Sequence, residues 1–89
     1  MRRTTSHFSG HVQGVGFRYT VMNIAQRFNV VGFVRNLPDG GVEVVVEGPD
    51  SERSDLVNEI GRHMGEYISD VRSTDSAGTG EFTRFTIRN

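Results

Sequence analysis

The sequence predicts an α+β fold, a ferredoxin-like βαββαβ sandwich with two helices packed on one face of an antiparallel sheet. Two observations predict it. The spacing of apolar residues changes twice along the chain, from the alternation of a strand to the wider period of a helix. A strand–turn–strand pattern lies between the two helical segments. Right-handed crossovers then place both helices on the same face of the sheet.

A strand over residues 6–12 opens the fold, with Phe8 and Val12 on one face. The opposite face of this strand carries His7, Ser9 and His11. From residue 17 the apolar residues recur at helical spacing, and they are Phe17, Val21, Ile24, Ala25 and Phe28. Asn29 is a suitable helix stop. This part of the chain therefore predicts a strand that leads directly into an amphipathic helix.

A β-hairpin follows over residues 30–47. The branched apolar run at residues 30–36 predicts a strand, and proline and glycine at residues 37–41 predict a turn in which Asp39 is a turn former. In residues 42–47, Val42, Val44 and Val46 share one face. Glu43 and Glu47 share the other face with Val45. Because no second group converges on the two carboxylates, we expect a solvated face and no acid–base pair.

The second half of the chain predicts a helix and two further strands. Asp50 or Ser51 is expected to cap the helix, which ends at Gly65. Its narrow apolar stripe consists of Val57, Ile60 and Met64. Strands are expected at residues 68–73 and 82–87, joined by a flexible connection at residues 76–80. The predicted core combines Phe8, Val21, Ile24, Phe28, Val44, Ile60, Phe85 and Ile87.

Length and composition limit the classes of function. The chain has 89 residues, enough for one domain over residues 1–89 with a single core. A net charge of -1 argues against nucleic acid or an anionic membrane as a partner. With no cysteine, neither a thiol nucleophile nor a cysteine metal site is available. No signal peptide or membrane segment is evident, so we expect a cytoplasmic location. Nothing in the sequence demands a dimer, so we expect a monomer.

The most informative segment is the loop that contains Gly10, Gly14 and Gly16, with Arg18 at the start of the helix. Glycine lets the backbone turn sharply, so several N–H groups can approach one anion at a helix N-terminus. Arginine adds a permanent planar cation that suits phosphate oxygens. The loop is not a P-loop, and its glycine order does not match a dinucleotide fingerprint. It predicts a small phosphate-binding site.

Metal chemistry is not expected at this site, and no cofactor is predicted. His7 and His11 stand four residues apart, a spacing that suits metal ligation on a helix. On a strand the same spacing separates them by about 13 Å, too far to share an ion. We therefore expect exposed histidines on the sheet face. His63 is expected only to lie near the C-terminus of the second helix.

Two segments of the chain resemble signatures of the acylphosphatase family. Residues 8–18 resemble the first signature, and residues 32–48 resemble the second through Gly32, Asn36, Gly40 and Gly48. Residues 85–87 are similar to the closing strand of that family. His11 stands where the family often carries a basic residue. The resemblance covers nearly the whole chain and implies hydrolysis of an acyl phosphate, with Arg18 and Asn36 as the catalytic residues.

The residues themselves suit the same reaction. The loop residues expected to hold phosphate are Gln13, Gly14, Val15, Gly16, Phe17 and Arg18. Asn36 lies just before the hairpin turn, and its amide can orient a water that attacks the phosphorus. The leaving carboxylate has a conjugate acid with a pKa of about 4, so it departs without a general acid. Charge stabilisation and in-line positioning are then the main requirements.

Two other functions compete with this hypothesis. An RNA-recognition module on the same fold needs exposed aromatic residues on its central strands, and residues 42–47 carry none. A regulatory or maturation domain would keep the anion pocket within a larger assembly, whereas we expect this domain to fill the chain. The sequence does not identify one physiological acyl phosphate, because a loop that binds only the phosphate has little means of distinguishing one acyl group from another.

Overall fold

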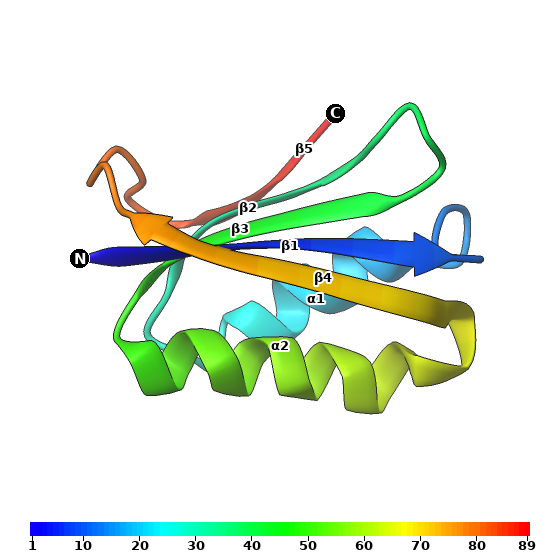
Figure 1. The fold of residues 1–89 in the computed structure, drawn as a ribbon, viewed down its shortest axis with the longest axis horizontal. Helices are drawn as coiled ribbons and strands as arrows, with labels where there is room; N and C mark the ends of the chain where they lie inside the picture. Colours follow the sequence, from blue (N-terminus) through cyan, green and yellow to red (C-terminus); the bar gives the residue numbers. More distant parts are fainter.

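Five strands form one sheet, in the order β4–β1–β3–β2–β5, in the computed structural model, which describes residues 1–89 (Figure 1). The elements are β1 (Arg2–Gly10), α1 (Phe17–Ala25), β2 (Val31–Asn36), β3 (Val42–Gly48), α2 (Asp50–Met64), a 3-10 turn (Gly65–Tyr67), β4 (Ile68–Ala77) and β5 (Phe85–Arg88). Figure 1 shows both helices on the same face of the sheet. The predicted α+β sandwich is confirmed. No helix is both long and apolar enough to cross a bilayer.

The sheet is antiparallel through its first four strands. β1 pairs with β3 and β4, and β3 pairs with β2, all antiparallel. β5 adds a parallel pair with β2, so the sheet is mixed and not antiparallel throughout as predicted. β4 and β5 lie at opposite edges of the sheet, so the chain crosses the sheet after β4 and reverses its direction. β5 therefore runs in the same direction as β2, which is opposite to that of β4.

Several element boundaries differ from those predicted. β1 begins at Arg2 and ends at Gly10, so Val12 is buried but lies beyond the strand. β4 continues to Ala77 because Arg2 of the longer β1 provides its partner. β5 begins at Phe85, and residue 82 lies before the strand with its ring packed on Phe33. Each shift reflects pairing with a distant segment, which local residue spacing does not report.

The helix ends also differ. α1 ends at Ala25, although Phe28 beyond it still packs against the core. The N-cap of α2 is Pro49, with an extended backbone, and not Asp50 or Ser51. The Asp50 carboxylate accepts a hydrogen bond from Arg53 within the first turns of the helix, so it does not cap the backbone.

The core lies between the helices and the sheet, as predicted. Its buried members include Phe8, Val21, Ile24, Val44, Ile60 and Phe85, and Phe28 and Ile87 pack against them at the edge. The stripe on α2 is formed by Leu56, Ile60 and Met64, while Val57 is only partly buried. The 56–60–64 spacing keeps one line of side chains facing the sheet, which explains why Leu56 takes the place expected for Val57.

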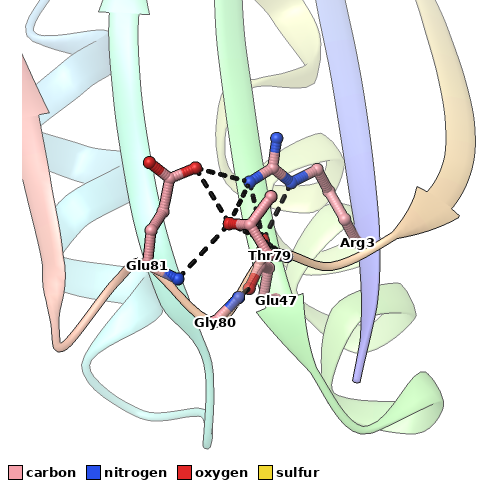
Figure 2. Close-up of polar contacts among 5 residues, drawn as sticks. All are labelled: Arg3, Glu47, Thr79, Gly80 and Glu81. Carbon is pink, nitrogen blue, oxygen red and sulfur yellow. Dashed lines mark hydrogen bonds and ion pairs between the residues drawn. The ribbon is translucent and has the colours of Figure 1, made fainter.

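Glu47 contradicts the predicted solvated face of β3. Its side chain is fully buried, whereas Glu43 is half-buried and ion-paired with Arg35 at 2.7 Å. Figure 2 shows the Glu47 carboxylate between Arg3 and the segment that follows β4. Oε2 accepts from Arg3 Nη2 at 2.7 Å and from the Thr79 N–H at 3.0 Å, and Oε1 accepts from the Gly80 N–H at 3.0 Å.

This network keeps Glu47 ionised inside the protein. Burial raises the pKa of Glu47, but the hydrogen bonds from the Thr79 and Gly80 amides and from Arg3 outweigh burial and lower the pKa to about 2. The segment after β4 thus closes the sheet face opposite the helices, and a charge-assisted network holds it there. Residues 79 and 80 are 32 and 33 positions away from Glu47 in the sequence, so no local pattern predicts the contact.

Candidate functional site

The sheet topology brings the glycine-rich loop and Asn36 to the same end of the sheet, where β1 and β2 finish. β1 and β2 both run antiparallel to β3, so their C-terminal ends lie on the same side. The loop starts after Gly10 at the end of β1 and ends where α1 begins at Phe17, and Asn36 is the last residue of β2. Two residues that are far apart in the sequence, Arg18 and Asn36, therefore line one cavity.

The backbone of the loop has the form of an anion-binding nest. Gly14 and Gly16 have φ angles of 79° and 77°, and no residue other than glycine has a positive φ. The sign of φ therefore alternates over residues 13–17, which turns successive N–H groups toward one concave side. Among the turn, loop and cap hydrogen bonds, none has a donor N–H from residues 12–19. These amides remain free for a bound group.

Arg18 lies in the first turn of α1 and lines the cavity. Its Nη1 donates to the Arg88 carbonyl oxygen at 3.4 Å and to Asn89 Oδ1 at 3.5 Å, both long hydrogen bonds. No carboxylate forms an ion pair with it. Arg18 is thus loosely held by the C-terminal residues, and most of its donors are free for an anion.

Asn36 also lines the cavity and is partly exposed. Its backbone is fixed by the pairing of β2 with β3, where it stands opposite Val42. Its side-chain amide makes no hydrogen bond within the protein, so no hydrogen bond supports a purely structural role for Asn36 at the edge of the turn. Both the donor and the acceptor of this amide can serve a small molecule.

The cavity has a volume of about 290 Å³, and its lining consists of Val12, Gly14, Gly16, Phe17, Arg18, Tyr19 and Asn36. Arg18 is the one charged residue among them, so the cavity favours an anion. A larger hollow of about 400 Å³ lies beside α2, but its arginine, Arg53, is ion-paired with Asp50 and Asp75. Charge therefore distinguishes the smaller cavity as the candidate site.

Two predicted loop residues do not line the cavity. The side chain of Gln13 turns toward the β2–β3 turn, where Nε2 donates to the carbonyl oxygens of Leu37 and Gly41. Val15 packs against the core. Tyr19, by contrast, lines the cavity with a 65% exposed side chain and was not singled out from the sequence. The sequence feature that could have identified Tyr19 is its position as an aromatic residue on the polar side of an amphipathic helix.

Only one of the two histidines expected on the sheet face lies there, namely His7, which is on β1 and half-buried. His11 is exposed after the end of β1, and His7 Nε2 lies 3.0 Å from the Asp39 carboxylate. Asp39 also accepts from the Gly41 N–H at 2.7 Å, which confirms its role in the turn. That hydrogen bond is the main cause of a lowered pKa of Asp39. No group of three His, Asp or Glu residues has the arrangement of a metal site.

Comparisons with known proteins identify the relatives of this chain. The family model for Acylphosphatase matches residues 5–87. An acylphosphatase of Methanospirillum hungatei is 56% identical over 90 residues, and the match covers 99% of this chain and 98% of the relative. The crystal structure of acylphosphatase from Bacillus subtilis superposes with a TM-score of 0.89 at 31% identity over the whole of both chains. HypF from T. kodakarensis matches this whole chain with a TM-score of 0.85 and 30% identity, over 12% of its own length.

Proposed function

We propose that this chain, which belongs to the acylphosphatase family, hydrolyses acyl phosphates by holding the phosphoryl group in the loop at residues 13–18 and orienting the attacking water with Asn36. The family match supports the reaction as a whole. The observation that carries the division of roles is the shared cavity, in which free loop amides, an unpaired Arg18 and an unbonded Asn36 amide meet.

The phosphoryl group binds to the backbone of the loop and to Arg18. Backbone N–H groups of residues 13–18 donate to the phosphate oxygens, and the N-terminus of α1 adds its partial positive charge. Arg18 donates in a fork to the same oxygens. These donors are in place before the reaction, so they stabilise charge on the transferred group without reorganisation.

Water attacks the phosphorus opposite the leaving carboxylate. The Asn36 amide holds the water through its carbonyl oxygen or its NH₂ group and does not take its proton at neutral pH. The P–O bond to the carboxylate breaks as the bond to water forms, and the products are a carboxylate and inorganic phosphate, which keeps the protons of the attacking water. A carboxylate leaves readily, so positioning and charge stabilisation supply the catalysis. No metal or cofactor takes part in this proposal.

An RNA-binding role has no support from the sheet surface. The aromatic residue on the outward face of β2, Phe33, is buried beneath Phe82, with ring centroids 5.7 Å apart. Base stacking needs exposed rings on the sheet. We therefore propose a small-molecule acyl phosphate as the partner, acted on by a monomer whose loop, Arg18 and Asn36 meet at one cavity.

The roles are tested with purified protein and benzoyl phosphate. Asn36→Ala is expected to lower kcat on the order of 10²-fold, because the water loses its orientation. Inhibition by inorganic phosphate is expected to stay nearly unchanged, since the loop amides and Arg18 remain. Asn23→Ala, a change of an exposed asparagine on α1, is the control and should leave kcat at the wild-type value. Normal turnover in Asn36→Ala with a lowered melting temperature would assign Asn36 a structural role instead.

A further inference from the structure

The side chain of Gln13 joins the phosphate loop to the turn between β2 and β3. Nε2 donates to the carbonyl oxygen of Leu37 at 2.9 Å and to that of Gly41 at 2.8 Å. Gln13 is 24 residues from Leu37 and 28 from Gly41, so this is a contact between two separate parts of the site. Both protons of one amide group are used.

The two carbonyl groups that accept from Gln13 belong to the residues at the two ends of the turn, Leu37 and Gly41. Leu37 N–H donates to the Gly41 carbonyl at 2.9 Å, and Gly40 N–H donates to the Leu37 carbonyl at 3.2 Å. The Gln13 amide therefore bridges the two sides of the turn where they are already joined to each other. Leu37 directly follows Asn36, so a shift of the two ends of the turn also moves Asn36, which we propose holds the water.

We propose that Gln13 is a positioning residue for hydrolysis, whose side chain sets the distance between the phosphate loop and Asn36. The inference rests on the proposed roles of the loop and Asn36. The backbone N–H of Gln13 belongs to the loop that holds the phosphoryl group, while its side chain holds the turn that carries Asn36. One residue thus links the group that is attacked to the group that orients the attacking water.

The chemistry of this contact requires a neutral amide. Two carbonyl oxygens must be satisfied by two protons from one nitrogen, which glutamine provides. Glutamate has the same shape but would place carboxylate oxygen against carbonyl oxygen. Methionine has nearly the same length and no donor. Asparagine is shorter by one methylene and does not reach both acceptors from the same backbone position.

The turn remains folded when the Gln13 contact is lost, because other contacts also hold it. His7 Nε2 lies 3.0 Å from Asp39 Oδ2, and Asp39 Oδ1 accepts from the Gly41 N–H at 2.7 Å. The β2–β3 ladder holds Asn36 opposite Val42. Loss of the Gln13 contact should therefore change the position of Asn36 by a fraction of an ångström without unfolding the hairpin.

Gln13→Met is the first test, with benzoyl phosphate as substrate. A displaced catalytic group typically costs up to 10²-fold, so we expect kcat to fall about 10-fold with KM within about twofold of wild type. Inhibition by inorganic phosphate should also stay within about twofold. Gln13→Glu should lower kcat at least as much. The matched control is Gln26→Met, which removes the Gln26–Met22 contact at the end of α1 and should leave kcat unchanged.

A double-mutant cycle with Asn36→Ala decides whether Gln13 acts through Asn36. We expect Gln13→Met to lower kcat in the wild-type background and to have no further effect in the Asn36→Ala background. Equal losses in both backgrounds, or weaker inhibition by phosphate, would overturn the inference while the proposed function stands. A normal kcat in Asn36→Ala alone would refute the proposed role of Asn36, and the inference with it.

Discussion

Replacing the buried Glu47 with glutamine tests how a charge stabilises the closed face of the sheet. Glutamine keeps the size of the side chain but removes its charge, and its NH₂ group replaces one of the two oxygens that accept from the Thr79 and Gly80 amides, so one of these two hydrogen bonds is lost. The folded protein lowers the pKa of Glu47 from 4.5 to about 2. A shift of this size corresponds to about 3 kcal/mol of folding free energy at neutral pH.

The sign of the effect follows from the lowered pKa. The stabilisation is fully present above the unfolded-state pKa of 4.5 and is lost as the pH falls through the folded-state value of about 2. Glu47→Gln should therefore be less stable than wild type by about 3 kcal/mol at pH 7. The difference between the two proteins should shrink steadily between pH 5 and about pH 2, where wild-type Glu47 also becomes neutral.

Urea unfolding of both proteins at a series of pH values measures this difference. Comparison at each pH removes the contributions of carboxylates outside the Glu47 network that titrate in the same range, such as Asp39. Glu59→Gln is the matched control. Hydrogen bonds from Arg62 are the main cause that lowers the pKa of Glu59 to about 2 as well, but its side chain is 25% exposed. Its stability effect should be smaller and should weaken with added salt.

A difference between wild type and Glu47→Gln that stays constant from pH 7 to pH 2 would refute this reasoning. It would mean that the lost stability comes from shape or packing and not from the charge. A variant as stable as wild type at pH 7 would show that the cost of burying the carboxylate cancels its hydrogen bonds.

Four further predictions concern the site and the backbone. Arg18→Ala should lower kcat/KM by about 10²–10³-fold, and Arg18→Lys should restore little of it because one ammonium does not reproduce the guanidinium fork; wild-type turnover in the lysine variant would contradict bidentate binding. Hydrolysis of benzoyl phosphate should continue in excess EDTA, and loss of activity that Mg²⁺ restores would refute the proposed mechanism. Gly32→Ala should lower the melting temperature strongly, since Gly32 has a φ of 149° and a Cβ there would lie 1.8 Å from the Val45 carbonyl oxygen. Gly61→Ala on α2 meets nothing within 4 Å and should stabilise the protein by about 0.5–1 kcal/mol in thermal unfolding.

Local residue spacing was sufficient to predict the helices and strands of this protein. The alternation of Val42, Val44 and Val46 and the helical spacing from Phe17 to Ala25 follow from the periods of a strand and a helix, so they are visible within a few residues. The conformation of the glycine-rich loop was predictable for the same reason. Its glycines and Arg18 lie within nine consecutive residues, and the positive φ angles of the glycines follow from their missing Cβ.

The contacts that join distant segments were not predictable in this way. The alternation of β3 placed Glu47 on the outward face, which is correct, but its burial depends on a segment more than 30 residues later. Gln13 was expected in the loop, and only the folded chain brings its side chain to Leu37 and Gly41. The physical reason is that periodicity reports which face a residue occupies, whereas burial and hydrogen bonding depend on what covers that face.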